Sequence, residues 1–328
     1  NWALAGNASN YYLAKNLFSG TSAANLQKIE SLRLSYETSL KGTNSTEITE
    51  RSIKYGTDVA EAIWNYSKTD NGHEAFKNVF PDFILPVSLG AWIPVGSQRA
   101  LLPYWSRNTS FVQKNTTIDP PAPHTFSYNS SSVFFKEAKE VYEMSKKLTA
   151  DQRAIALFFA DGAGSVTPPG HHMNVATEVI KQKKSTLAFA AETYAKMGLA
   201  LNDAFIACWR CKYRFNTIRP ITYIRETIDK NWTPIVGTPP FPEYTSGHSS
   251  GAGAAAEVLK AQFGENTPFV DNTYAGVYPS RNYSNFSDYA NETSNSRLYG
   301  GIHFRQGCEE GVLNGRRIAQ NVLSLNFR

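Results

Sequence analysis

The sequence predicts an all-α protein, a helical bundle with additional helices at its N-terminal end. Apolar residues recur at helical spacing, for example Ile53, Ala60 and Ile63. Two-residue alternation bounded by turn signals is nearly absent, which argues against strands. A run of small residues is typical of a helix that packs tightly against a neighbour, and such a run is found at Gly251, Gly253 and 254–256.

The helices can be placed in order along the chain. Residues 86–130 are rich in Pro, Asn, Ser and Thr, which predicts a long excursion with little regular structure. Thr149 and Gln152 form a capping box ahead of an apolar run, and Asp161-Gly162 should end that helix. The expected helices are 23–41, 45–68, one from about 133, one after Thr149, 172–183, 184–211, 247–263 and 307–324. We expect one helical domain over 1–328, with N-terminal helices and the long loop at 1–130 and the bundle at 131–328.

Composition narrows the functional classes. The net charge of +5 comes without a polybasic run, so it predicts no nucleic-acid partner; alone it indicates an ordinary basic surface, although the surplus cations also suit a small anion. No stretch approaches the roughly 18 apolar residues of a membrane span. Cys208 and Cys211 form one C-x-x-C without a second pair, which is a weak zinc signal. With Cys308 they are expected to be thiols on helices.

Residues 247–251 read Gly-His-Ser-Ser-Gly and fit the G-x-S-x-G elbow of serine hydrolases, with Ser249 as the nucleophile. Such an elbow needs a buried strand leading directly into the turn. Pro239, Pro240 and Pro242 precede it here, and proline cannot donate to a strand ladder. The same letters, read as Ser246-Gly247-His248, leave Ser249 as an early helix residue.

Cationic residues in two other motifs of the chain support the second interpretation. Lys212 stands seven residues before Arg219-Pro220, and Ser296-Arg297 stands six before His303. Guanidinium forks match pairs of oxygens, lysine adds a point charge, and a helix starting at Gly247 presents free N–H groups. The three motifs together therefore predict a receptor for a tetrahedral oxyanion.

The set resembles the signature of the superfamily that joins vanadium-dependent haloperoxidases to type-2 phosphatidic acid phosphatases and bacterial acid phosphatases. The first motif is intact at Lys212 and Arg219-Pro220, and the second has Thr245 where the family has Pro. The third is intact from Ser296 to His303 but has Gly307 where the family has Asp. The resemblance implies a four-helix-bundle core that holds the oxyanion.

Local residues favour the haloperoxidase branch. Trp209 stands three residues before Lys212, as in chloroperoxidase-like members, and Phe241 occupies a position where algal bromoperoxidases have His. Residues 161–169 are similar to a haloperoxidase stretch whose Asp forms a salt bridge with the third-motif arginine, here Asp161 with Arg297. The chain most resembles the vanadium iodoperoxidases of marine bacteria.

The resemblance implies vanadate as cofactor, with halide, most readily iodide, and hydrogen peroxide as substrates. Vanadate would be bound by Lys212, Arg219, Ser246, Gly247, Arg297 and His303. His303 would ligate the metal, His248 would be the general acid–base, and Lys212 would donate to the peroxide. The alternatives are a phosphatase acting through a phospho-histidine at His303, an oxyanion-binding module without catalysis, and the serine hydrolase.

We further expect a monomer that is periplasmic or secreted, and no leader peptide within this chain, which starts at Asn1-Trp2. Because Gly307 replaces the family Asp, and Glu309 and Glu310 lie six and seven positions after His303, we expect a backbone carbonyl to orient His303. His171 and His172 could line the pocket entrance or face solvent on a loop.

Overall fold

The computed structural model describes residues 1–327, which form two compact units, Asn1–Ala75 and the chain from Phe76 onward. The first unit holds three helices, α1 (Trp2–Leu17), α2 (Ala23–Lys41) and α3 (Thr46–Ser67). Helix α1 packs against both others, most closely at Gly56, where a β-carbon would lie 2.0 Å from the Ala5 carbonyl oxygen. The sequence predicted α2 and α3 but not α1.

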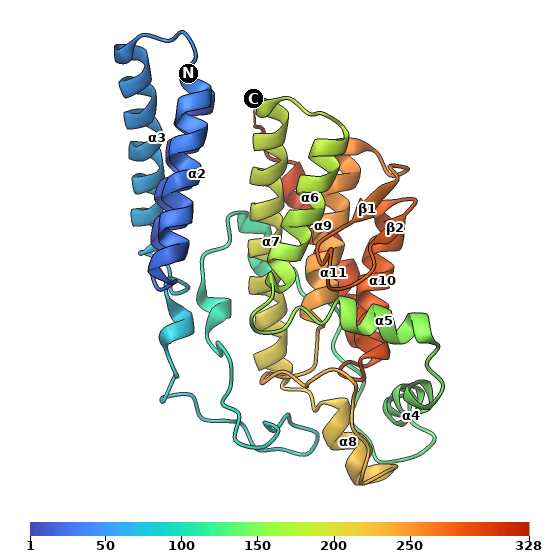
Figure 1. The fold of residues 1–328 in the computed structure, drawn as a ribbon. Helices are drawn as coiled ribbons and strands as arrows, with labels where there is room; N and C mark the ends of the chain where they lie inside the picture. The colour runs from blue at the N-terminus through green and yellow to red at the C-terminus, as the bar shows by residue number, and fades with distance from the viewer. Residues whose placement is uncertain (328) are drawn as a thin grey trace. The chain divides into compact units, whose positions relative to one another are not determined.

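The chain then crosses a long segment with little regular structure, as predicted (Figure 1). Three short 3₁₀ helices interrupt it: η1 (Ala75–Lys77), η2 (Trp105–Arg107) and η3 (Gln113–Thr117). The buried Asp203 carboxylate anchors its later part by accepting hydrogen bonds from the backbone N–H groups of Phe111 (2.8 Å) and Val112 (3.1 Å). Backbone that would otherwise be unpaired is thereby fixed against the bundle.

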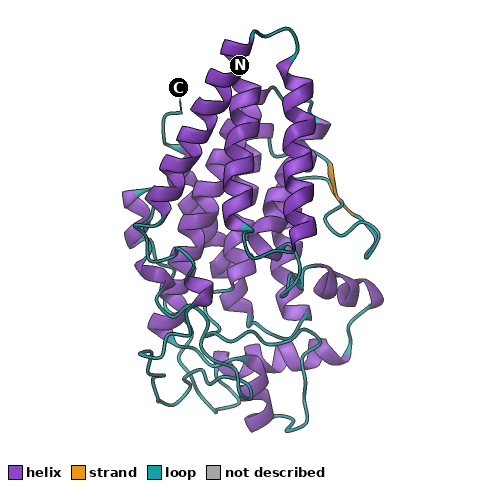
Figure 2. Ribbon diagram, turned by 60° about the vertical axis from the view of Figure 1, so that its left-hand side comes forward, coloured by secondary structure: helices purple, strands orange, loops and turns teal. Residues whose placement is uncertain are grey.

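Helices dominate the second unit (Figure 2). They are α4 (Val133–Lys146), α5 (Ala150–Phe158), α6 (Thr167–Gln182), α7 (Leu187–Phe215), α8 (Pro220–Thr227), α9 (Gly247–Phe263), α10 (Phe286–Tyr299) and α11 (Arg305–Leu323). Within residues 1–327 the strands are confined to a short antiparallel hairpin, β1 (Phe269–Asp271) with β2 (Arg281–Tyr283). The all-α prediction is therefore confirmed.

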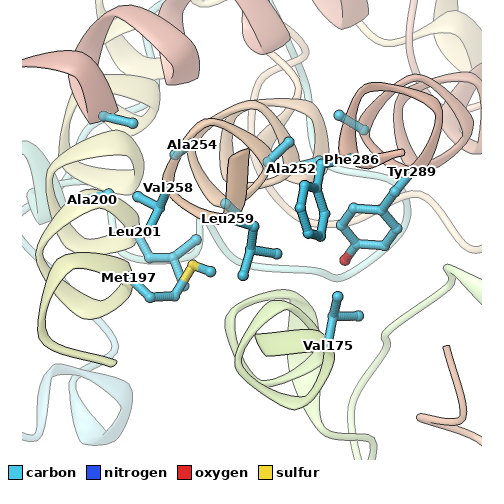
Figure 3. Close-up of a cluster of buried hydrophobic side chains, with 14 of the residues drawn as sticks. Val175, Met197, Ala200, Leu201, Ala252, Ala254, Val258, Leu259, Phe286 and Tyr289 are labelled. Carbon is cyan, nitrogen blue, oxygen red and sulfur yellow. The ribbon is translucent and has the colours of Figure 1, made fainter. Parts of the chain in front are cut away.

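Helix α9 is the centre of the bundle, because it packs against α7, α10 and α11. Its small residues allow this: a β-carbon on Gly253 would lie 2.2 Å from the Val312 carbonyl oxygen of α11. Larger apolar side chains from α6, α7 and α10 fill the space on its other sides (Figure 3). Burial of this apolar surface supplies the main favourable term for the fold, and it fixes the N-terminus of α9, which the site uses.

The predicted helix bounds differ from the structure in a few places. Helix α9 has the expected bounds, and the Thr149–Gln152 capping box forms at the start of α5. Helix α6 begins earlier than expected, at Thr167, because its two prolines occupy the first turn, where a missing N–H costs nothing. Helices α8 and α10 were not predicted. The first compact unit ends at Ala75. The single helical domain over 1–328, with its parts at 1–130 and 131–328, stays a prediction.

No helix among residues 1–327 is both long and apolar enough to cross a bilayer.

Candidate oxyanion site

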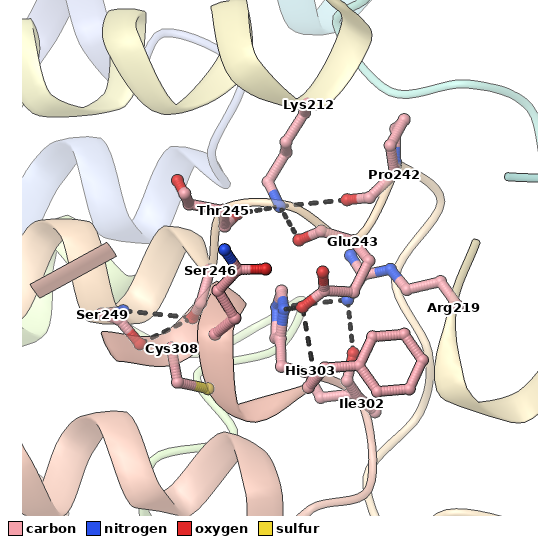
Figure 4. A network of polar contacts seen from close by, with 12 residues as sticks. Lys212, Arg219, Pro242, Glu243, Thr245, Ser246, Ser249, Ile302, His303 and Cys308 are labelled. Carbon is pink, nitrogen blue, oxygen red and sulfur yellow. Dashed lines mark hydrogen bonds and ion pairs between the residues drawn. The ribbon is translucent and has the colours of Figure 1, made fainter. Parts of the chain in front are cut away.

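Five segments of the second unit contribute residues to one site, and Figure 4 labels Lys212, Arg219, Ser246 and His303 among them. Lys212 lies near the end of α7, and Arg219 immediately precedes α8. Ser246 caps the N-terminus of α9, whose first residue is Gly247. Arg297 lies in the last turn of α10, and His303 follows in the connection to α11. Each charged side chain is at most 2 % exposed, so the structure brings the three sequence motifs together.

Lys212 holds the loop that precedes α9. Its ammonium donates to the backbone carbonyl oxygens of Pro242 (3.0 Å), Glu243 (3.0 Å) and Thr245. A lysine ammonium has three donors, and the loop uses all of them. Lys212 therefore contributes its charge to the site and shapes the loop that carries Ser246.

Each of the two arginines has one terminal nitrogen without a hydrogen-bond partner. Arg219 donates from Nε to the Phe241 carbonyl oxygen (2.9 Å) and from Nη1 to the Ile302 carbonyl oxygen (2.7 Å), while Nη2 is buried without a partner. Arg297 bonds the Ser296 hydroxyl and the Phe159 carbonyl oxygen, and its Nη1 is buried without a partner. The Nε2 atom of His248 is also buried and lacks a hydrogen bond.

Buried polar groups are nearly always hydrogen-bonded, so these atoms need an explanation. An oxyanion supplies it for the two arginine nitrogens, because each of its oxygens accepts from several donors. Burial lowers the pKa of Lys212, and it lowers the pKa values of Arg219 and Arg297 to about 10. The arginines remain charged at neutral pH, and the three cations outnumber the buried acids beside the site, Glu243 and Asp161.

His303 is held by Glu243. Its Nδ1 lies 2.7 Å from the Glu243 Oε1 atom, and its Nε2 lies 3.1 Å from Arg219 Nη1. Burial, followed by the charges of Arg219 and Lys212, lowers the pKa of His303 well below its ordinary value, so the ring is neutral. A neutral ring that donates from Nδ1 to the carboxylate presents a lone pair on Nε2.

The expected backbone carbonyl is therefore wrong: a carboxylate orients His303. The expectation considered only residues close to His303 in sequence, whereas Glu243 lies on the loop before α9. Glu309 is 62 % exposed and pairs with Arg305 at 3.5 Å, so it does not substitute for the family Asp.

Comparison with known proteins agrees with this geometry. A family model described as the VCPO second helical-bundle domain matches residues 192–327. A solved structure described as the first bacterial vanadium-dependent iodoperoxidase matches with a TM-score of 0.88 and 34% identity, covering 99% of this chain and 80% of that one. The chain belongs to the vanadium-dependent haloperoxidases.

Two further structures share the fold of this haloperoxidase. They are the holo and apo forms of a bacterial vanadium-dependent chloroperoxidase, each 16% identical, with TM-scores of 0.76 and 0.77. They cover 97% of this chain and 80% and 82% of their own chains. None of the curated proteins compared matches the chain.

Asp161 lies near the site, but its contacts differ from the expected salt bridge with Arg297. It accepts from Tyr274 and contacts His171 Nδ1 at 2.9 Å, and its Oδ2 atom lies 3.6 Å from His248 Nε2. Burial alone would raise the pKa of Asp161, but the hydrogen bond and charge of His171 outweigh burial and hold it at about 2. Asp161 thus faces His248, and Arg297 uses backbone carbonyls instead.

Both histidines of α6 are buried, so the alternative of a solvent-facing loop is wrong. His171 Nε2 also contacts Asp271 at 2.7 Å. Burial alone would lower the pKa of His171, but the two carboxylates raise it to about 9. His172 contacts the Tyr289 hydroxyl at 2.7 Å, and burial lowers its pKa to about 3. No local pattern predicts these pairings, because Asp271 lies 100 positions after His171 and Tyr289 lies 117 positions after His172.

Aromatic rings cover the cations. The ring centroids of Trp209 and Phe241 are 5.0 Å apart, and the Phe241 centroid lies 4.9 Å from Lys212 Nζ and 5.0 Å from Arg219 Cζ. The negative faces of aromatic rings stabilise nearby cations. Both aromatic residues therefore lie at the site, as the sequence predicted.

Ser249 does not form a hydrolase site. It lies in the first turn of α9, its backbone N–H donates to the Ser246 hydroxyl (3.2 Å), and its own hydroxyl contacts Ser246 and Ser294. No strand leads into this turn.

The three cysteines are buried and free, and residues 1–327 contain no His/Cys/Asp/Glu cluster able to hold a metal ion.

Proposed function

We propose that this protein oxidises halide with hydrogen peroxide to hypohalous acid, using vanadate, and that iodide is its preferred halide. The observation that carries the proposal is the pair of buried donors without partners, Arg219 Nη2 and Arg297 Nη1, beside the His303 imidazole, whose Nε2 carries the lone pair and contacts Arg219 Nη1. Iodide is the halide most easily oxidised, and the 34% identical relative is described as an iodoperoxidase.

Each residue has a defined task in this proposal. Arg219 and Arg297 would bind the vanadate oxygens, with Ser246 and the Gly247 N–H at the α9 N-terminus completing the shell, and Lys212 would offset charge. His303 Nε2 would be the metal ligand. Bound vanadate would supply a Lewis-acidic centre that activates hydrogen peroxide toward halide.

His248 is the proton acceptor in this scheme. Burial, followed by the charge of Arg297, lowers its pKa well below the ordinary value, so the ring is neutral and its Nε2 can accept a proton from hydrogen peroxide. Asp161 lies 3.6 Å from that nitrogen and would stabilise the imidazolium that forms. We further propose that the protein acts as a monomer in the periplasm or outside the cell.

The test is an iodide oxidation assay with hydrogen peroxide. Protein treated with a chelator should be inactive, and added orthovanadate should restore activity. Phosphate at millimolar concentration should slow the restoration, because it competes for the same donors. Hydrolysis of a phosphate monoester by the vanadate-free protein, without iodide oxidation after vanadate addition, would contradict the proposal and support the phosphatase alternative.

A further inference from the structure

The carboxylate of Glu243 occupies the space that a side chain at position 307 would need. A β-carbon on Gly307 would lie 2.3 Å from Glu243 Oε1 and 3.0 Å from Oε2, so a side chain there would require the Glu243 carboxylate to move. Position 307 is where the family motif has Asp. The same volume therefore holds a carboxylate in this chain, but the carboxylate comes from a different segment.

Glu243 is fixed in that position from several directions. Its backbone N–H donates to the Thr217 carbonyl oxygen (2.9 Å), and its carbonyl oxygen accepts from Lys212 (3.0 Å). Its Oε1 atom accepts from both the His303 ring and the Phe304 backbone N–H (3.1 Å). The Gly307 carbonyl oxygen accepts from the Ser246 N–H (2.9 Å), which ties position 307 to the same loop.

We propose that Glu243 is the positioning residue for the vanadium ligand His303, and that Gly307 is required because it leaves room for the Glu243 carboxylate. This inference rests on the proposed function of the site. Glu243 would act through His303, not on the substrate: its hydrogen bond keeps the proton on Nδ1 and aims the Nε2 lone pair into the site. Such partners of metal-bound histidines affect affinity about 10- to 100-fold.

The inference predicts different effects of Glu243 on vanadate affinity and on phosphate affinity. Vanadate binding uses the oriented Nε2 lone pair, whereas phosphate is held by the cations alone. Loss of Glu243 should therefore weaken vanadate binding while leaving phosphate binding undiminished. A purely structural role in the loop would weaken both.

The first experiment uses Glu243→Gln and Glu243→Ala in the whole chain. Equilibrium binding of orthovanadate and of inorganic phosphate is measured by calorimetry on the vanadate-free protein. We expect Glu243→Ala to lower vanadate affinity about 10- to 100-fold, Glu243→Gln to fall between it and the unmodified protein because its shape is kept, and phosphate affinity not to fall. Glu310→Gln is the matched control and should change neither affinity.

The second experiment reads the ring directly. Long-range ¹⁵N–¹H correlation spectra of ¹⁵N-histidine protein without vanadate distinguish the two neutral tautomers among its six histidines. The unmodified protein should show His303 protonated on Nδ1, and Glu243→Ala should show a mixture or the other tautomer. An unchanged His303 tautomer together with unchanged vanadate affinity would overturn the inference.

The third experiment exchanges the two positions. Gly307→Asp alone places a side chain against Glu243 and should weaken vanadate binding, whereas Gly307→Asp added to Glu243→Ala should strengthen it relative to Glu243→Ala. This change of sign is expected only for residues that share one role, so purely additive effects would overturn the inference. An unmodified protein that binds no vanadate would instead refute the proposed function.

Discussion

At the scale of single residues, the proposed chemistry rests on two imidazoles that burial, reinforced by neighbouring cations, keeps neutral. His303 has a carboxylate on Nδ1, so its lone pair lies on Nε2, the atom proposed as the ligand. His248 lacks a hydrogen bond at Nε2 and faces Asp161 at 3.6 Å, which suits a ring that accepts and releases a proton. Two histidines in similar surroundings thus acquire different roles from the acids beside them.

This difference predicts opposite phenotypes for two substitutions. His303→Ala should abolish vanadate retention and iodide oxidation together, because it removes the nitrogen ligand. His248→Ala should retain most of the vanadate and lose turnover about 10²- to 10⁴-fold, the usual contribution of a general acid–base. Vanadium content after gel filtration and steady-state iodide oxidation measure the two effects. His124→Ala, on the exposed loop, is the control and should behave like the unmodified protein. Tight vanadate binding with iodide turnover in His303→Ala would remove the ligand from this scheme.

Most of the site could be predicted from three short motifs, because the residue types and their spacing carry the chemistry. The contacts between distant segments could not. Glu243 lies 60 positions before His303, and no local pattern pairs them. The available signal was the combination of Gly307, which leaves space, with an acid three positions before Ser246. Asp161 was placed near the correct residues, but its partner was His171 and not Arg297.

At the scale of helices, the site depends on how closely α9 and α11 approach. Gly253 on α9 and Gly315 on α11 each face a backbone carbonyl of the other helix, and a β-carbon on Gly315 would lie 2.1 Å from the Ser250 carbonyl oxygen. This packing fixes the N-terminus of α9, with Ser246 and Gly247, against the segment that carries His303. Helices α8 and α10 were not predicted. Helix α8 is short, and α10 buries Thr and Ser residues as well as Phe and Tyr, so its sequence lacks a clear apolar periodicity.

Gly315→Ala should therefore separate the two helices and destabilise the protein by about 1–3 kcal/mol, the usual cost of overpacking. The matched control is Gly198→Ala in α7, an exposed helical glycine with nothing within 4 Å of an added β-carbon. That variant should be neutral or more stable by up to about 1 kcal/mol. Urea unfolding followed by circular dichroism measures both. Equal stability of the two variants would contradict the tight α9–α11 packing.

At the scale of the whole molecule, the chain forms two units, and the second carries every residue of the anion site. That unit buries Lys212, Arg219 and Arg297, and the buried acids beside the site, Glu243 and Asp161, do not balance the three cations. Burying unpaired charge is costly, so the folded state without an anion retains a penalty that a bound oxyanion would relieve. A ligand that binds only the folded state also stabilises it by mass action.

We therefore expect orthovanadate, and more weakly phosphate, to raise the melting temperature of the vanadate-free protein by several degrees. A ligand at 100 times its Kd contributes about 2.7 kcal/mol, and a domain of this size gains about 2–4 °C per kcal/mol. In hydrogen exchange, added protection should appear at the end of α7, the start of α9 and the α10–α11 connection, and not in α1–α3. Sodium chloride at matched ionic strength should give neither effect, and Arg297→Gln should reduce both. Protection spread equally over the two units would show that the anion acts elsewhere than at these buried cations.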